Sequence, residues 1–293
     1  MELTTYFTGL LANIEPKPTV VATAKRSQEK LREQLENDNQ VSQASPDTYL
    51  SGSYARDTAI NDIKDVDIIM LIDVDHNKTS PDVVIAWLQG ALQNYYSDVM
   101  PQGRSVRVTT DGGFHLDVVP ATSISHRNGP VWIPDREVKA WVASHPKGQI
   151  AFASERNTNT DGYYKHLVKI MKFWRDRLSN PDARVKSYIL ESLIAERILS
   201  APASYAHAIV HIFQSIYQQC NAYLSSAVVP KITDPGYTSV NVAKRWTIQE
   251  FSAFLAMVQS SYKVSKAALD SEDQDESAQL WQKLFGSKFT PKD

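Results

Sequence analysis

Two pairs of residues at a fixed spacing stand out in the segment SGSYARDTAINDIKDVDIIMLIDVD, residues 51 to 75. Gly52 and Ser53 form the first pair, Asp65 and Asp67 form the second, and eleven residues separate them. The run VDIIMLIDV is apolar and β-branched and predicts a strand, on which both aspartates point to the same face. Neighbouring carboxylates repel each other unless a cation lies between them. The second pair therefore predicts a site for a divalent cation.

The Gly-Ser pair complements that site. Glycine lets the backbone turn tightly against a ligand, and the N–H groups that follow it can point at phosphate. Protein-bound Mg²⁺ is commonly held by one or two carboxylates together with substrate phosphates. Gly52 and Ser53 therefore predict a phosphate site joined by a short loop to the metal site.

A third acidic residue, Asp117, stands alone in the apolar segment FHLDVVP, whose strand we expect to end at Pro120. A buried acid on a strand is usually paired or bound to a metal, since its desolvation is costly. RSVRVTT and FHLDVVP flank Asp111-Gly112-Gly113 and predict a hairpin. This hairpin places Asp117 on a strand that can lie beside the first two aspartates.

The combined pattern resembles the polymerase-β-like nucleotidyltransferases: Gly-Ser, Asp-x-Asp after the short interval, then a later strand Asp. The motifs GSYARDTAI, DVDI and LDVVP are similar to those of the CD-NTases. These are bacterial relatives of cyclic GMP-AMP synthase and oligoadenylate synthetase that act in anti-phage (CBASS) signalling. The resemblance covers roughly residues 45 to 250. It implies an α+β fold in which a polymerase-β-like sheet lobe packs with a C-terminal helical lobe, with the active site in the cleft between them.

The hydrophobic periodicity agrees with two lobes. Residues 19–37 predict a long helix before the first catalytic strand, and the chain becomes helical from about residue 135. We expect a sheet lobe over residues 1–134 and a helical lobe over 135–293. Within the second lobe we expect a short helix over 135–144 and a polar loop over 145–162, followed by helices over 161–178, 187–199, 204–224, 247–269 and 276–285.

Three residues of the helical lobe are candidate substrate ligands. Lys172 can neutralise a triphosphate or be an ordinary solvated helix residue. Ser187 can cap a helix or reach a phosphate, and Tyr188 can stack on a base. The resemblance implies that this lysine and the Ser-Tyr pair hold the triphosphate and the base of one nucleotide. It also includes the loop ITDPGYTSVN, with Asp234, Pro235 and Asn241.

Other polar and aromatic residues have a structural explanation beside a functional one. Arg56 can contact phosphate or pair with Asp57, and His115 is more often a hydrogen-bonding neighbour of a carboxylate than a base. Asp73 and Asp75 are expected in the turn that leaves the strand, and the loop residues Asn157, Thr158 and Asn159 are candidates for base recognition. The six tryptophans are expected in the core: Trp87, Trp132, Trp141, Trp174, Trp246 and Trp281.

The composition favours small nucleotides over long nucleic acids as substrates. The chain has 293 residues and a net charge of −2, without the basic excess that phosphate-tracking proteins show. The single cysteine, Cys220, excludes an internal disulfide, and neither a signal peptide nor a membrane span is predicted. We expect a cytoplasmic protein.

The resemblance implies a Mg²⁺-dependent enzyme that condenses nucleoside triphosphates, ATP among them, into a cyclic di- or trinucleotide or a short linear one, with release of pyrophosphate. Asp65 and Asp67 are expected to hold two Mg²⁺ ions, with Mn²⁺ as the alternative, and Asp117 the ion that activates the attacking ribose hydroxyl. The implied partners are an effector that the product activates and regulatory proteins of the same defence system. Alternatives are transfer of a nucleotide to a protein, an RNA end or a small-molecule hydroxyl, and an inactive nucleotide-binding scaffold.

Overall fold

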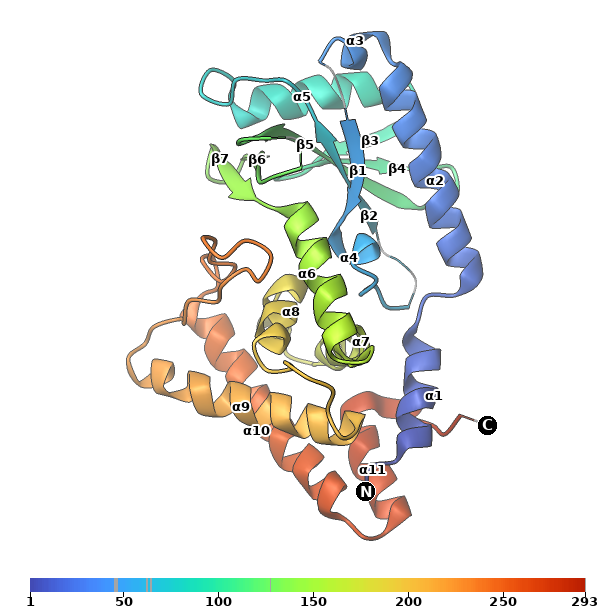
Figure 1. Cartoon of the computed structure of the whole chain (residues 1–293), viewed down its shortest axis with the longest axis vertical. Helices are drawn as coiled ribbons and strands as arrows, with labels where there is room; N and C mark the ends of the chain where they lie inside the picture. The colour runs from blue at the N-terminus through green and yellow to red at the C-terminus, as the bar shows by residue number, and fades with distance from the viewer. Residues whose placement is uncertain (45–46, 62, 64, 127, 293) are drawn as a thin grey trace. The chain divides into compact units, whose positions relative to one another are not determined.

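The computed structural model describes residues 1–44, 47–61, 63, 65–126 and 128–292 (Figure 1). The chain forms two compact units, a sheet unit over Pro16–Ala151 and a helical unit that joins Met1–Glu15 to Phe152–Asp293. The division falls later than the expected boundary after residue 134, because the last strand of the sheet lies beyond it. The first residues belong with the helical unit.

The sheet unit is a mixed sheet with helices on one face. In the described part of the chain the sheet has seven strands in the order β1-β2-β5-β4-β3, and β6 pairs with β5 and β7. β2 and β5 run parallel and the other pairs are antiparallel. The elements are α2 (Pro18–Asn37), α3 (Asn39–Ser42), β1 (Asp47–Ser51), α4 (Gly52–Ala55), β2 (Asp65–Leu71), α5 (Pro81–Leu92), β3 (Asp98–Pro101), β4 (Val106–Thr109), β5 (His115–Ser123), β6 (Val131–Asp135) and β7 (Ala140–Ser144).

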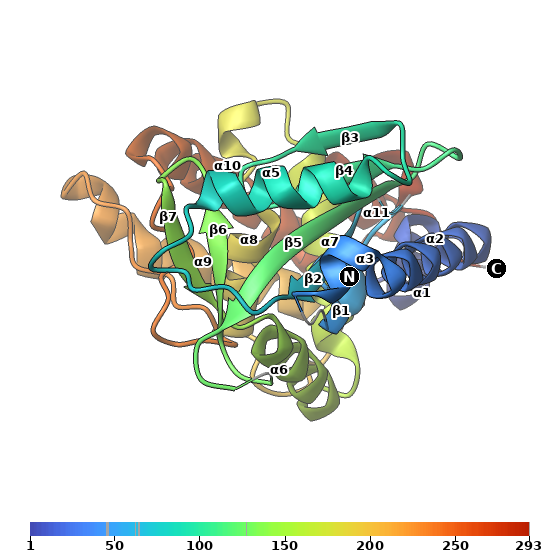
Figure 2. The same ribbon diagram turned by 90° about the horizontal axis from the view of Figure 1, so that it is seen from above.

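Alternation along the strands separates a covered face from the face that carries the acids. Val66, Ile68 and Met70 of β2 are fully buried and pack in one cluster with apolar residues of α2 and α5. α5 lies along β3, β4, β5 and β6 on this face (Figure 2). Asp65 and Asp67 have the opposite parity and therefore lie on the other face. Farther along that face, a second apolar cluster holds residues of β2, β5 and β6.

The helical unit is built around buried aromatic side chains. Trp174 and Trp281 are almost completely buried, and Trp174 lies edge-on to Phe213 at a centroid distance of 4.9 Å. α10 begins with a capping box in which Thr247 and Glu250 satisfy each other's backbone N–H groups. The elements are α1 (Thr4–Ile14), α6 (Pro146–Asn159), which begins in the sheet unit, α7 (Tyr163–Asp176), η1 (Pro181–Ala183), α8 (Ser187–Ala195), α9 (Tyr205–Ser225), α10 (Ile248–Asp270), α11 (Gln274–Phe285) and η2 (Gly286–Lys288).

Most predicted elements are confirmed, and the region around residue 140 is the main correction. The expected helix over 135–144 is wrong: β6 and β7 form a hairpin there, in which buried Asp135 accepts from the N–H groups of Glu137 and Val138. The expected loop over 145–162 is also wrong, since most of it is α6. Near the end of α6, the side chain of Asn157 accepts a hydrogen bond from the backbone N–H of Lys165.

Pro120 does not end its strand, which continues to Ser123. β4 pairs with β5 only as far as Val118, and β6 joins at Thr122, so no strand is paired with that edge at Pro120. Proline is tolerated where one edge of a strand has no partner. Over the described residues, no helix has the length and apolar character that a membrane crossing requires.

Candidate active site

Three carboxylates meet on the face of the sheet opposite α2 and α5. Asp65 and Asp67 lie on β2, and Asp117 lies on the parallel neighbour β5, directly opposite Asp67 in the register. Adjacent strands are about 4.8 Å apart, so the side chains of such register partners on one face are neighbours. The Asp117 side chain is 10% exposed and the Asp65 side chain 36%. The structure therefore brings the three predicted catalytic acids together.

Arg107 of β4 bridges two of these acids. Its register partner is Asp117, and its Nε and Nη2 donate to the two oxygens of that carboxylate at 2.9 and 2.6 Å. Nη2 also donates to Oδ2 of Asp65 at 3.0 Å. The hydrogen bonds from Arg107 to Asp117, together with the surrounding acids, raise the pKa of the guanidinium above its ordinary value. Arg107 thus holds a positive charge among the acids.

The surroundings of Asp67 disfavour its charged form. Burial and the negative charges of Asp65 and Asp117 raise the pKa of Asp67 from 3.8 to about 6, although Arg56 and Arg107 act in the opposite direction. Excess negative charge in a half-buried position is what a bound cation relieves. The environment of Asp67 therefore favours a bound cation.

Gly52 lies directly against Asp67. β1 ends at Ser51, the register partner of Asp67, and the chain turns at Gly52 with a φ of 66°. A Cβ atom at residue 52 would lie 1.7 Å from Oδ2 of Asp67, so only glycine fits there. Ser53 follows in the short helix α4, and its carbonyl accepts from the N–H of Thr58 at 2.9 Å. The predicted Gly-Ser turn is therefore next to the acids.

The three candidates of the helical unit have partners within that unit. The Lys172 ammonium lies 3.3 Å from Oε1 of Glu191, and both side chains are buried. The Ser187 hydroxyl accepts from Nη1 of Arg175 at 2.6 Å. Each of these candidates therefore has a structural role whatever its role in binding.

Tyr188 is hydrogen-bonded to the loop ITDPGYTSVN, residues 232–241. Its hydroxyl donates to Oδ1 of buried Asp234 at 2.7 Å, and the same oxygen accepts from the N–H of Gly236 at 2.8 Å. The Oδ1 atom of Asn241 accepts from the N–H groups of Ile232 and Ala243, closing that loop. The Tyr188 ring is thus anchored at its hydroxyl end.

The structure also shows where the other candidate residues and the tryptophans lie. Arg56 is buried, and its charge acts on Asp67. Nδ1 of His115 lies 3.2 Å from the hydroxyl of Thr109, a partner other than the carboxylate that the sequence suggested. Asp73 and Asp75 follow the end of β2, as predicted, and Asn157, Thr158 and Asn159 belong to α6 rather than to a loop. Trp174, Trp246 and Trp281 are buried, whereas Trp87, Trp132 and Trp141 are half-buried.

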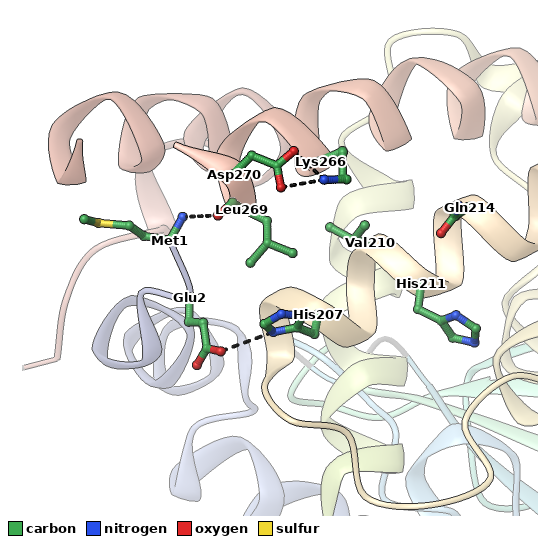
Figure 3. A pocket seen from close by; sticks show the side chains of 9 residues that line it. All are labelled: Met1, Glu2, His207, Val210, His211, Gln214, Lys266, Leu269 and Asp270. Atoms are coloured by element: carbon green, nitrogen blue, oxygen red, sulfur yellow. Dashed lines mark hydrogen bonds and ion pairs between the residues drawn. The ribbon is translucent and has the colours of Figure 1, made fainter. Parts of the chain in front are cut away.

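A separate pocket of about 540 Å³ lies in the helical unit (Figure 3). Most of its charged groups already have a hydrogen-bond or ion-pair partner. The amino group of Met1 donates to carbonyls of α10, Lys266 pairs with Asp270, and Nδ1 of His207 lies 3.2 Å from Glu2. These pairings leave the pocket with little charge to offer a ligand, and the acids of the sheet unit remain the candidate active site.

Comparison with known proteins decides the family. The model of the Second Messenger Oligonucleotide or Dinucleotide Synthetase domain, SMODS, matches residues 1–157, more than half of the chain. The chain belongs to the SMODS family. A model of the cGAS/DncV-like nucleotidyltransferase C-terminal helical domain matches residues 151–263 of this SMODS protein.

Curated relatives of this SMODS protein are cyclic oligonucleotide synthases. A cyclic AMP-AMP-AMP synthase from Acinetobacter is 32% identical, with 97% of this chain and 84% of the relative covered. A cyclic AMP-AMP-GMP synthase from Enterobacter hormaechei is 29% identical, with 99% and 92% covered. The fold matches that of E. coli CdnC, solved as a CdnC:HORMA-deltaN complex, with a TM-score of 0.80, 20% identity and coverage of 99% and 98%.

These findings confirm the predicted CD-NTase resemblance, the α+β nucleotidyltransferase fold and the enzymatic activity. The SMODS protein is a nucleotidyltransferase that condenses nucleoside triphosphates into a cyclic oligonucleotide, and its family acts in anti-phage signalling. Nucleotidyltransferases of this type generally require a divalent metal ion.

The residues present fit such an ion. Among the described residues, no group of three or more His, Cys, Asp or Glu side chains is arranged as a metal-binding set. Asp65 and Asp117 face Arg107 instead. Three carboxylates on adjacent strands nevertheless supply the oxygen donors that hard divalent cations prefer, and burial together with the neighbouring acids raises the pKa of Asp67, which a bound cation would offset.

Arg107 is the site residue that sequence reasoning missed in this SMODS protein. A usable signal was present, because the hairpin predicted around Gly112 sets Arg107 opposite Asp117. The buried position of Arg56 had no such signal, since it depends on the turn after Gly52.

Proposed function

We propose that this SMODS protein joins three nucleoside triphosphates, ATP among them, into a cyclic trinucleotide with release of pyrophosphate. The observation that carries the proposed chemistry is the pairing of Asp67 with Asp117 on parallel strands, with Asp65 on the same face. The relatives that cover almost the whole chain are synthases of cyclic AMP-AMP-AMP and cyclic AMP-AMP-GMP, which supports three units and the use of ATP.

The proposed metal ligands are the three acids. Asp65 and Asp67 would hold two Mg²⁺ ions, or Mn²⁺, and Asp117 would hold the one nearer the attacking ribose hydroxyl. Bound there, the ions would neutralise charge on the attacking and leaving oxygens and keep them in line. A cation bound at Asp67 would offset the burial and the repulsion that disfavour its charged form. Gly52 leaves that carboxylate room that any side chain would fill.

The proposed nucleotide ligands come from both units. Gly52 and Ser53 would present backbone N–H groups to the phosphates. Lys172 and Ser187 would hold the triphosphate, and the Tyr188 ring, fixed through Asp234, would stack on a base. That the acids and these three residues face one substrate remains a prediction.

The proposed partners follow from the role in defence. The product would activate a separate effector, and a regulatory protein would control synthesis. The CdnC:HORMA-deltaN complex is an example of such an assembly in a protein of the same fold. The proposed compartment is the cytoplasm, where nucleoside triphosphates and Mg²⁺ are available.

The double variant Asp65→Ala/Asp67→Ala tests the chemistry. Wild type is incubated with all four triphosphates and Mg²⁺, treated with phosphatase, and its products are identified by mass spectrometry. We expect a phosphatase-resistant cyclic trinucleotide from wild type and none from the variant, whose circular dichroism spectrum is unchanged. Equal product from both proteins would refute the catalytic role of these acids. Nucleotide label on protein, RNA or a small-molecule hydroxyl, without a cyclic product, would support the alternative acceptors.

A further inference from the structure

Arg107 bridges two of the three acids of the cluster. Its guanidinium contacts Asp117 through two nitrogens and Asp65 through one, so three of the six carboxylate oxygens of the cluster accept from it. The Arg107 side chain is 28% exposed and therefore only partly screened by water. Bidentate pairing with a carboxylate is strong and holds the carboxylate in a fixed orientation.

We propose that Arg107 is a built-in counter-ion that competes with the divalent metal for Asp65 and Asp117 and thereby sets the metal affinity of the site. This inference rests on the proposed function of the three acids as metal ligands. Arg107 is a positioning residue in this role, because it acts through the two carboxylates.

The charges of the cluster support competition rather than coexistence. Three carboxylates together with Arg56 and Arg107 carry a net charge of about −1 when all are ionised. One divalent cation reverses that sign, and a second makes the surroundings of Arg107 strongly positive. The contacts of Arg107 with Asp65 and Asp117 therefore lose their electrostatic basis once metal binds. Binding of the metal therefore displaces Arg107 from the two carboxylates.

Competition also couples the metal to the nucleotide. A site that is free of Arg107 only part of the time has its apparent affinity lowered by that fraction. Free Mg²⁺ therefore binds weakly, whereas Mg²⁺ that arrives with a triphosphate brings additional oxygen ligands and overcomes the competition. Arg107 keeps Asp65 and Asp117 paired until substrate is present.

The opposite arrangement has an opposite consequence. If Arg107 stayed on Asp117 in the metal-bound enzyme and only oriented it, removing the arginine would leave the carboxylate loose and weaken metal binding. The sign of the change in affinity therefore separates the two roles.

The test measures Mn²⁺ binding without nucleotide, by electron paramagnetic resonance of the free ion, in the full-length protein. We expect Arg107→Gln to bind Mn²⁺ about tenfold more tightly than wild type, as an arginine-paired fraction near 90% would give. Arg136→Gln is the matched control, since it removes the same charge from an exposed pair with Asp82 on the same unit. We expect its Mn²⁺ affinity to equal that of wild type.

Arg107→Lys keeps the proposal testable if the glutamine variant does not fold. Lysine retains the charge but cannot form the parallel bonds, so we expect a smaller gain in affinity, severalfold at most. Unchanged or weaker Mn²⁺ binding in a folded Arg107 variant would overturn the proposal. If Asp65→Ala/Asp67→Ala also bound Mn²⁺ as wild type does, the proposed metal site itself would be wrong. Loss of binding in that double variant, together with no gain in the Arg107 variants, would refute the competition alone.

Discussion

Replacing Asp67 by Asn should stabilise the metal-free protein while removing its activity. The pKa of Asp67 rises from 3.8 to about 6 in the folded state. Since one pKa unit corresponds to about 1.4 kcal/mol, the ionised carboxylate costs the folded protein about 3 kcal/mol above pH 6. Asparagine has nearly the same shape as protonated aspartate, so the variant avoids this cost at every pH.

The pH dependence follows from the direction of the shift. Between about pH 4 and pH 6 the folded protein binds more protons at Asp67 than the unfolded chain does, so the free energy of unfolding falls as pH rises. The advantage of Asp67→Asn should therefore be about 3 kcal/mol at pH 7.5, equivalent to several degrees in Tm, and should vanish near pH 4. Urea unfolding in EDTA at several pH values measures it.

Asp65→Asn is the matched control for this prediction. It weakens the ion pair with Nη2 of Arg107 at 3.0 Å and removes only one of the charges that act on Asp67, so we expect a clearly smaller gain in stability than for Asp67→Asn. Both variants should lose product formation by at least about a hundredfold, because each removes a proposed ligand of the metal ions that neutralise the reacting phosphates. An Asp67→Asn protein no more stable than wild type at pH 7.5, or an advantage that persists unchanged to pH 4, would refute the electrostatic reasoning.

Two further substitutions test the turn and the helical unit. Gly52→Ala should lose activity and destabilise the protein by about 1–2 kcal/mol or more, because its Cβ would meet Oδ2 of Asp67 and its φ is 66°. Gly112→Ala meets no atom within 4 Å, and a similar loss there would contradict this explanation. Lys172→Met should lower the free energy of unfolding by about 3–5 kcal/mol, because the buried Glu191 carboxylate loses its ion pair with the Lys172 ammonium. Lys172→Met/Glu191→Leu should recover much of that stability but keep a raised KM for ATP, and a wild-type KM in the stable double variant would argue against triphosphate binding by Lys172.

The acids and the turn beside them could be predicted because each depends on local chemistry. The alternation of Asp65 and Asp67 on a β-branched strand, and the Asp-Gly-Gly turn before Asp117, fix faces and neighbours without tertiary information. The long helix α2 followed from its periodicity in the same way. These features also carried the family resemblance.

The remaining features depend on contacts that local patterns do not encode. The β6–β7 hairpin is an exception, because Asp135 accepts from the N–H groups of Glu137 and Val138 in a local turn that the helix predicted over 135–144 overlooked. α6 is polar and only weakly amphipathic, so its sequence resembled a loop. The bridge from Arg107 to Asp65 joins residues of non-adjacent strands and requires the complete strand order.

The parallel pairing of β2 with β5 has a consequence for the newly made chain. Asp67 and Asp117 are fifty positions apart, and the crossover between them must supply α5, β3 and β4 before the two strands can align. Such non-local pairing forms late, because the intervening segment must be ordered first. A nascent or truncated polypeptide that stops before β5 therefore lacks the paired carboxylates altogether. With the acids as the proposed metal ligands, no messenger can be made before β5 has joined β2.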